Sequence, residues 1–390
     1  MTNNPCFNEY RTWIEIDSVA FNHNIAQLSS VVGPRTSLGV VVKADAYGHS
    51  LELIGKLCQE NDAVSWLFTA GIKEAVRLRV NGITKSILVL AYADDNPLAL
   101  LDYQITYGVS DIHTARHLSE IAAPLYKKIA VHIKIDSGMS RFGFQSETLN
   151  EAYKELSTLP GLTITGIFTH LSDTNNSDYS FIKQQLAIFD SAANQLENVL
   201  KRRLFIHALA SGALHLEKRY DCVRVGTNVY GYWKSPLQQQ RLSALQSSLS
   251  LQPILTWKTR ISALKDINPG DAVGYHRAFI APKPMKIAIL PVGYYDGYPR
   301  GLSHKGQVLI RNTYAPLIGI ISMNSMLADV THIGSVQIGD EVVLCGDFPG
   351  LRAHDLAAMT DSIQNEFLTR ISPCIPRVLS NKKDVYEKSH

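Results

Sequence analysis

Cysteine is scarce in this chain of 390 residues, which has five scattered thiols and no Cys-x-x-Cys pair. That scarcity argues against a disulfide framework and a cysteine-based zinc site, and it fits a reducing cytoplasm. No segment approaches the roughly 18 consecutive apolar residues that a membrane-spanning helix needs. Residues 1–5 lack a basic segment followed by an apolar one, so we expect no secretion signal.

A strong charge of either sign is also missing, because the net charge is only +3 at pH 7. The sequence therefore gives no reason to expect nucleic acid or a membrane surface as a partner. Apolar residues make up 45% of the chain and charged residues 19%, which is enough to build a large core. The length is sufficient for two domains.

One apolar stretch, residues 38–42, leads directly into Lys43 and is followed by a glycine-containing turn. Such a run is typical of a parallel strand that is buried on both faces. Lys43 would then lie at the carboxyl end of this strand, where α/β barrels place their catalytic groups. A desolvated lysine has a lowered pKa, and its neutral amine can attack an aldehyde. The alternative is a strand-end lysine that simply reaches solvent.

Strand-like and helical segments alternate up to about residue 235. After residues 38–42, the predicted strands are residues 64–69, 86–90, 106–109, 129–135, 163–168, 204–208 and 222–225. The predicted helices are residues 19–31, 72–80, 113–121, 148–156 and 179–200, with another beginning at Pro97. This alternation implies a parallel sheet, and eight such units over roughly 220 residues have the size of a (β/α)8 TIM barrel.

The pattern changes after residues 238–241, which we interpret as a polar linker. From about residue 251 the chain has short strands and tight turns, with one helix expected from Ala353. We therefore expect an α/β fold in which a TIM barrel, residues 17–240, is followed by a mainly-β domain, residues 241–390. A strand within residues 1–16 is expected to pack with the second domain.

Polar side chains follow several of the predicted barrel strands. These residues are Lys43, Arg141, His170, Ser211 and Arg224, with Gly226 just beyond Arg224. The carboxyl ends of barrel strands form the catalytic face, and a glycine there lets a phosphate approach backbone amides. The sequence therefore predicts a functional site at this end of the barrel, although each residue could singly be an ordinary rim or surface residue.

Several motifs, in this order along the chain, resemble those of the alanine racemase family. They are residues 41–49, 134–143, 224–226, 274–275, 292–300, 321–324 and 376–378. The resemblance extends from about residue 12 to residue 379. It implies a cytoplasmic isomerase that uses pyridoxal 5'-phosphate to interconvert L- and D-alanine and supplies D-alanine for the cell wall. It also implies a homodimer with shared active sites, and neither a metal nor a membrane partner.

The resemblance further implies a role for each matched residue. Lys43 would hold the cofactor covalently and act as one acid/base group, and Tyr275 of the partner subunit would be the other. The phosphate would be bound by Tyr47, Ser211, Gly226 and Thr227. Arg224 would face the pyridine nitrogen with support from His170, while Arg141 and Met323 would contact the substrate. The family's equivalent of Lys134 is often a carbamate, an anion that braces the arginine matching Arg141, so Lys134 is a candidate for this modification.

The chain departs from the usual family pattern at three positions. Asn365 stands where a tyrosine usually touches the phosphate and narrows the substrate site, so Asn365 is expected to contact both cofactor and substrate. The smaller amide leaves room for a larger side chain and can hydrogen-bond a hydroxyl, which makes serine, or a broader set of amino acids, an alternative substrate. Ala210 and Asn324 replace a more usual asparagine and aspartate.

Two other functions remain open at this point. A pyridoxal-phosphate-dependent decarboxylase of basic amino acids shares the barrel and β-domain plan. Such enzymes normally place a carboxylate at the pyridine nitrogen and a glycine-rich loop at the phosphate, so Arg224 and the single Gly226 argue against this function. A cofactor-holding protein without turnover would lack the β domain, so residues 250–380 and Tyr275 argue against it.

Overall fold

The computed structural model of the chain describes residues 10–218 and 220–381. Two units are distinguished by their internal contacts. The barrel unit contains residues 21–46 and 51–251, and the β unit contains residues up to 20, residues 47–50 and residues from 252 onward. The chain therefore enters the β unit for a short stretch just after Lys43 and then returns to the barrel unit.

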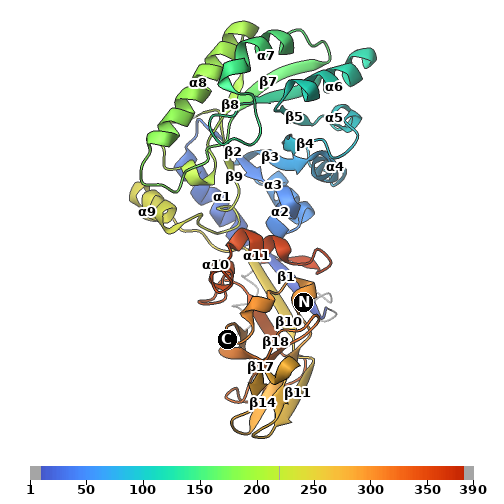
Figure 1. Ribbon diagram of the computed structural model, residues 1–390, viewed down its shortest axis with the longest axis vertical. Helices are drawn as coiled ribbons and strands as arrows, with labels where there is room; N and C mark the ends of the chain where they lie inside the picture. Colours follow the sequence, from blue (N-terminus) through green and yellow to red (C-terminus); the bar gives the residue numbers. More distant parts are fainter. Residues whose placement is uncertain (1–9, 219, 382–390) are drawn as a thin grey trace. The chain divides into compact units, whose positions relative to one another are not determined.

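The barrel unit is built on eight parallel strands in the order β8-β7-β6-β5-β4-β3-β2-β9. They are β2 (Ser37–Val41), β3 (Val64–Gly71), β4 (Ser86–Tyr92), β5 (Thr106–Val109), β6 (Ile129–Lys134), β7 (Leu162–Phe168), β8 (Phe205–His207) and β9 (Cys222–Val225). A bridge between Ala210 and Arg224 joins the two ends of the sheet, and the Arg224 amide donates to the Leu209 carbonyl at 3.0 Å. The predicted TIM barrel is thereby confirmed (Figure 1).

Helices precede, connect and follow these strands. They are α1 (Ser18–Val32), α3 (Leu51–Glu60), α4 (Ile72–Val80), α5 (Leu98–Asp102), α6 (Ile112–Ala122), α7 (Leu149–Leu156), α8 (Ser180–Leu200) and α9 (Pro236–Leu245). Asp17 caps the first of them, since its carboxylate accepts the amides of Val19 and Ala20 at 2.9 and 3.0 Å. The sequence prediction missed helix α3.

Aromatic rings from β3, β6, β7 and β8 pack together in the barrel unit. The rings of Phe168 and His207 stack with centroids 5.0 Å apart, and Trp66 lies 5.6 Å from His132. Gly39 on β2 makes room for this packing, because a Cβ atom there would lie 2.3 Å from the Phe68 ring. The apolar run before Lys43 therefore includes its glycine for a steric reason.

The predicted linker at residues 238–241 is wrong, since these residues lie within helix α9. Ser235 caps the helix by accepting the Gln238 amide at 3.2 Å, and Pro236 occupies its first turn. The apolar periodicity that predicts helices is missing because a buried polar residue, Gln238, shares the inward face with Leu242.

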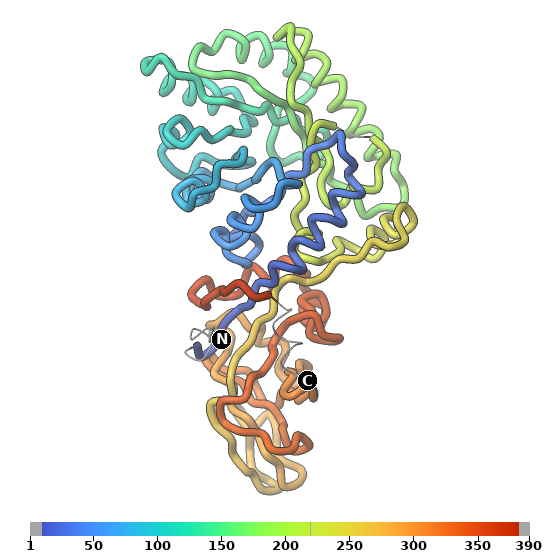
Figure 2. The backbone as a smooth tube through the Cα atoms, turned by 180° about the vertical axis from the view of Figure 1, so that it is seen from behind, coloured from blue at the N-terminus to red at the C-terminus, as the bar shows by residue number. Residues whose placement is uncertain are grey.

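The β unit contains a nine-stranded sheet in the order β11-β14-β17-β16-β15-β18-β10-β1-β19. Its strands are β1 (Thr12–Asp17), β10 (Leu255–Arg260), β11 (Ala263–Ile267), β14 (Met285–Leu290), β15 (Gln307–Ile310), β16 (Thr313–Ile318), β17 (Met326–Asp329), β18 (Glu341–Cys345) and β19 (Arg377–Ser380). A separate hairpin joins β12 (Ala272–Val273) to β13 (Phe279–Ile280). Figure 2 shows the blue strand β1 beside the yellow strand β10, to which it is antiparallel.

Two helices complete the β unit, where the sequence predicted one. The predicted helix is α10 (Ala353–Ala358), and the second is α11 (Gln364–Arg370), which carries Asn365. Within residues 10–218 and 220–381, no helix combines the length and the apolar character needed to cross a membrane.

Candidate active site

Lys43 begins a short left-handed turn, α2 (Lys43–Gly48), two residues after β2 ends. The backbone φ angles of Ala44, Asp45, Ala46 and Tyr47 all lie between 52° and 56°. Non-glycine residues lose about 1–2 kcal/mol each in this left-handed region. Four in succession therefore make a strained segment, which persists only if its surroundings hold it in place.

The carboxylate of Glu74, on helix α4, holds this turn from one side. Its Oε1 atom accepts the Ala44 amide at 2.6 Å and the Asp45 amide at 3.4 Å. Its Oε2 atom accepts the Ala70 amide at 2.9 Å. Hydrogen bonds to a carboxylate are stronger than neutral ones, so Glu74 offsets part of the strain and fixes the backbone just after Lys43. The sequence reasoning missed Glu74, which resembles any acid in the first turn of a helix.

The environment of Lys43 lowers the pKa of its amine. Although part of the residue is exposed, desolvation of the amine lowers this pKa, the charge of Arg141 lowers it further, and the carboxylate of Glu74 opposes both effects. The strand behind Lys43 is anchored, because the Val42 amide donates to the Phe68 carbonyl at 2.9 Å. Lys43 is thus a well-placed candidate nucleophile and base at the carboxyl end of a barrel strand.

Lys134 is a second lysine with a lowered pKa at this end of the barrel. It is buried at the end of β6, with its Nζ atom 5.0 Å from the centroid of the Phe142 ring. Burial, followed by the charges of Arg141 and Arg224, lowers its pKa to about 8, although Asp136 acts in the opposite direction. Across residues 10–218 and 220–381, no carboxylate forms an ion pair with Lys134. The region is therefore rich in positive charge, which suits an anionic ligand.

Arg141 lies in the loop after β6 and is exposed. The Asp136 carboxylate shapes this loop by accepting the amides of Gly138, Met139 and Ser140 at 2.9–3.1 Å. Arg141 acts electrostatically on Lys43, Lys134 and His170. These four predicted residues therefore gather at one end of the barrel unit.

Arg224, on β9, is buried and donates to neutral acceptors throughout the described structure. It bonds to Nδ1 of His207 at 2.7 Å, to the Thr169 carbonyl at 2.6 Å and to Nδ1 of His170 at 3.5 Å. Burial lowers the pKa of Arg224 to about 10, so its guanidinium stays charged at neutral pH. Burial, followed by the charge of Arg224, lowers the pKa of His170 to about 3, so its imidazole is neutral.

The hydrogen-bond chain continues beyond the predicted residues. Nε2 of His207 lies 2.9 Å from Nδ1 of His132, and both side chains are fully buried. Because Arg224 can only donate, His207 accepts through Nδ1, and its Nε2–H is left to donate to His132. His132 and His207 were not predicted as site residues. The sequence feature that could have pointed to each of them was a histidine within an otherwise apolar strand.

Ser211, Gly226 and Thr227 lie close to one another at the ends of β8 and β9. The Gly226 amide donates to Oγ of Ser211 at 3.0 Å, and the side chains of Ser211 and Thr227 are buried. A backbone amide beside a buried hydroxyl can bind a phosphate oxygen. This part of the barrel unit therefore contains the groups of the predicted phosphate site.

Four predicted site residues belong to the β unit. Tyr47 follows Lys43 in the strained turn, and burial raises its pKa to about 12. Asn365 lies in α11, where its carbonyl accepts the Thr369 hydroxyl at 2.7 Å. The Tyr275 and Met323 side chains are 64% and 53% exposed, so most of each is free to contact another molecule.

Gly48, the last residue of α2, lies close to helix α11 within the β unit. Its φ angle is +81°, and a Cβ atom there would lie 2.3 Å from the Leu368 carbonyl oxygen. Only glycine tolerates both the backbone angle and the close approach. The glycine after Tyr47 therefore has a defined structural role.

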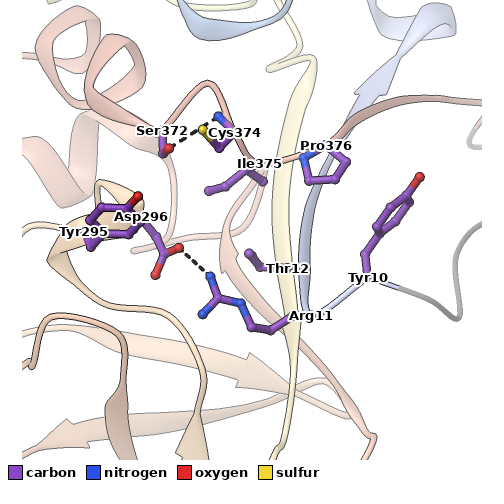
Figure 3. A pocket seen from close by; sticks show the side chains of 9 residues that line it. All are labelled: Tyr10, Arg11, Thr12, Tyr295, Asp296, Ser372, Cys374, Ile375 and Pro376. Carbon is purple, nitrogen blue, oxygen red and sulfur yellow. Dashed lines mark hydrogen bonds and ion pairs between the residues drawn. The ribbon is translucent and has the colours of Figure 1, made fainter.

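The β unit also contains a pocket of about 230 Å³ (Figure 3). Arg11 and Asp296 lie in its wall and form an ion pair at 2.6 Å. The full lining is Tyr10, Arg11, Thr12, Tyr295, Asp296, Ser372, Cys374, Ile375 and Pro376. None of the predicted site residues lines this pocket.

Comparison with known proteins agrees with the resemblance of the motifs. The family model described as "Alanine racemase, N-terminal domain" matches residues 16–234, and "Alanine racemase, C-terminal domain" matches residues 254–379. Alanine racemase 2 of Caldanaerobacter subterraneus subsp. tengcongensis is 35% identical over 394 residues, covering 98% of each chain. The alanine racemase of Clostridium perfringens is 37% identical over 380 residues, covering 96% of each chain.

Solved structures give the same result. Alanine racemase of Clostridium difficile 630 superposes with a TM-score of 0.88 at 29% identity, covering 95% of this chain and 96% of that chain. Alanine racemase of Bartonella henselae, described with covalently bound pyridoxal phosphate, superposes with a TM-score of 0.79 at 27% identity, covering 95% and 100%. The predicted fold, enzyme class and cofactor are confirmed. The chain belongs to the alanine racemase family, the pyridoxal-phosphate-dependent isomerases that interconvert L-alanine and D-alanine.

Proposed function

We propose that Lys43 and Tyr275 are the two acid/base groups of this racemase and act on opposite faces of the bound substrate. The observation that carries the proposal is a lysine at the carboxyl end of a barrel strand whose pKa is lowered by burial and by Arg141. Racemisation removes the α-proton from one face and returns a proton to the other. Two bases on opposite faces achieve this without rotating the substrate.

The described residues fit pyridoxal phosphate. Lys43 would supply the amine for covalent attachment, and Ser211, Gly226 and Thr227 would supply neutral groups for the phosphate, as would Tyr47 by the resemblance to the family. The positive charges of Arg141 and Arg224 favour an anionic ligand. When bound, pyridoxal phosphate supplies an electron-withdrawing ring that stabilises negative charge at the substrate α-carbon.

Arg224 would limit how strongly the α-carbon is activated. Its guanidinium donates to His207, Thr169 and His170, and it remains protonated at neutral pH. A donor of this kind directed at the pyridine nitrogen keeps that nitrogen unprotonated. Arg224 would therefore favour prompt return of a proton to the substrate α-carbon by Lys43 or Tyr275 over side reactions.

Arg141 would bind the substrate carboxylate, with Met323 closing the substrate site. Lys134 would carry a carbamate, which forms when a neutral amine adds carbon dioxide. The lowered pKa of Lys134, about 8, makes that amine more available. The resulting anion would also balance the positive charge of Arg141 and Arg224 in this end of the barrel.

We propose that the working unit is a homodimer in which the partner supplies Tyr275 and Met323. Both side chains are more than half exposed in the single chain, and so is Tyr295 in a neighbouring turn. Exposed aromatic groups of this kind are typical of surfaces that another subunit covers. We also place the enzyme in the cytoplasm, which fits the free thiols of Cys58, Cys222, Cys345 and Cys374.

The proposal predicts that Lys43→Ala and Tyr275→Phe each lower kcat for L-alanine racemisation, by about 10²–10⁴-fold for the loss of Tyr275 as a proton donor. Formation of D-alanine is the measurement. Tyr126→Phe is the matched control, because Tyr126 is 99% exposed and lies outside the site, so its activity should equal that of the wild type. Full activity of either Lys43→Ala or Tyr275→Phe would refute the assignment.

Asn365 carries a second proposal, acceptance of serine alongside alanine. An amide on α11 in place of a tyrosine offers space and a hydrogen-bond partner for a hydroxyl. The same assay with L-serine tests this. Asn365→Tyr should reduce kcat/KM for L-serine more than for L-alanine, and an unchanged ratio would contradict a specificity role.

A further inference from the structure

Two buried amide side chains, Asn228 and Gln238, lie behind the predicted phosphate site and have no assigned role. Asn228 follows Gly226 by two residues, and Gln238 lies in the first turn of α9. Their exposed fractions are 0% and 1%, so neither is an ordinary surface amide. Burying an amide is costly unless its polar atoms are paired, and here the pairing is extensive.

The two amides bond to each other in both directions. Nε2 of Gln238 donates to Oδ1 of Asn228 at 3.0 Å, and Nδ2 of Asn228 donates to Oε1 of Gln238 at 3.3 Å. Backbone groups fix which end is oxygen and which is nitrogen. The Lys234 amide donates to Oε1 of Gln238 at 2.7 Å, and Nδ2 of Asn228 donates to the Tyr232 carbonyl at 2.9 Å.

The amide pair is connected directly to the phosphate groups. Nε2 of Gln238 also donates to the Ser211 carbonyl. The hydroxyl of the same Ser211 accepts the Gly226 amide at 3.0 Å. The turn after Gly226 is closed by the Val229 amide, which donates to the Gly226 carbonyl at 2.8 Å. Gln238 thus holds one phosphate-binding segment, and Asn228 is part of the other.

We propose that the Asn228–Gln238 amide pair positions Ser211 and Gly226 and so sets the affinity for the phosphate group of the cofactor. A site whose donors are already in place loses less conformational freedom on binding. Hydrogen bonds from residues behind the binding groups commonly hold such donors in place before the ligand binds. The pair makes helix α9 a support of the phosphate site. This inference rests on the proposed function of Ser211 and Gly226.

The test compares two ligands of the apoprotein, pyridoxal 5'-phosphate and pyridoxal, which lacks the phosphate. Gln238→Met keeps the side-chain length, introduces no charge and removes the side-chain hydrogen bonds that Gln238 makes to Asn228, Lys234 and Ser211. We expect the Kd for pyridoxal phosphate to rise at least about tenfold while the Kd for pyridoxal changes by less than about twofold. Absorbance titration measures both constants without requiring turnover.

Leu242→Met is the matched control, since Leu242 is buried one turn further along α9 and lies outside the amide pair. It should leave both Kd values at wild-type levels. If Gln238→Met does not fold, Asn228→Ala serves instead, because it spares the Gln238 bonds to Ser211 and Lys234. Asn228→Ala should also raise the Kd for pyridoxal phosphate, but by a smaller factor than Gln238→Met.

If a folded variant shows the same increase in Kd for both ligands, or no increase for either, the inference is overturned while the proposed function stays intact. Failure of the wild-type apoprotein to bind pyridoxal phosphate would refute the proposed function itself.

Discussion

Arg224 shows how single residues set the chemistry of this site. A buried guanidinium normally pairs with a carboxylate, but its acceptors here are carbonyl groups and neutral imidazoles. His207 accepts a hydrogen bond from Arg224 and is itself hydrogen-bonded to His132, so a chain of hydrogen-bonded dipoles stabilises the positive charge of Arg224. Arg224 therefore remains a donor, because the imidazoles of His170 and His207 that accept from it have strongly lowered pKa values.

The buried histidines predict a defined pH dependence of stability. Burial and the charge of Arg224 lower the pKa of His132 to about 3, and they lower the pKa of His207 strongly as well. In the unfolded chain both pKa values are about 6.5, so between pH 3 and 6.5 the unfolded state binds more protons. The free energy of unfolding should therefore fall by about 1.4 kcal/mol per histidine for each pH unit below 6.5.

Urea unfolding at pH 7.5 and pH 5.5 measures this effect. His132→Asn removes one of the two groups and should make the decrease in stability smaller. His117→Asn changes an exposed histidine and should leave the decrease as in the wild type. An identical pH dependence in His132→Asn and the wild type would show that His132 is not held neutral by the fold.

The left-handed turn after Lys43 is the element that most directly shapes the site. Its strain is local, but the groups that hold it come from elsewhere, namely Glu74 from α4 and the close approach of Leu368 to Gly48. Asp45 adds an ion pair to Arg77 at 3.1 Å. The backbone that follows Lys43 is therefore fixed by several residues that are distant in the sequence.

Removing the Glu74 carboxylate should destabilise this turn. We expect Glu74→Ala to lower the free energy of unfolding by about 1–3 kcal/mol, because it leaves the amides of Ala44 and Ala70 without their charged acceptor. Attachment of pyridoxal phosphate at Lys43 should also become slower. Urea unfolding and the absorbance change on adding the cofactor to the apoprotein measure the two effects.

Glu120→Ala serves as the control, since Glu120 is an exposed acid on α6. Wild-type stability together with wild-type attachment in Glu74→Ala would mean that the turn holds its shape without Glu74.

The sequence predicted elements well where hydrophobic periodicity reports burial directly. All eight barrel strands were located in this way, as was the helix from Ala353. Helix α9 was missed because Gln238 occupies an inward position through hydrogen bonds that no periodicity reveals. The left-handed turn could not be predicted, since Ala44, Ala46 and Tyr47 have no preference for it.

The grouping of the candidate site residues was predictable where these residues lie at strand ends. Lys43, Arg141, His170 and Arg224 interact electrostatically in the barrel unit, as expected from their positions. Glu74 was missed because its partner Ala44 lies 30 residues earlier in the chain and presents only a backbone amide. The motifs of the family, rather than any local pattern, identified Tyr275 as a candidate base.

At the scale of the whole molecule, the nine-stranded sheet joins distant parts of the sequence. Strand β1 pairs with β10 on one side and with β19 on the other, so the first and last described strands are neighbours. The sheet of the β unit thus combines the early strand β1 with strands from the second half of the described sequence. The same unit carries the exposed Tyr275, which in the proposed dimer would act together with Lys43 of the other subunit.

Mixing two inactive variants tests the central claim most directly. Lys43→Ala and Tyr275→Phe subunits are combined, allowed to exchange and assayed for D-alanine formation from L-alanine. If each site takes Lys43 from one subunit and Tyr275 from the other, half of the dimers have one intact site, and about a quarter of wild-type activity should return. No recovery after verified subunit exchange would contradict a racemase whose two bases come from different subunits.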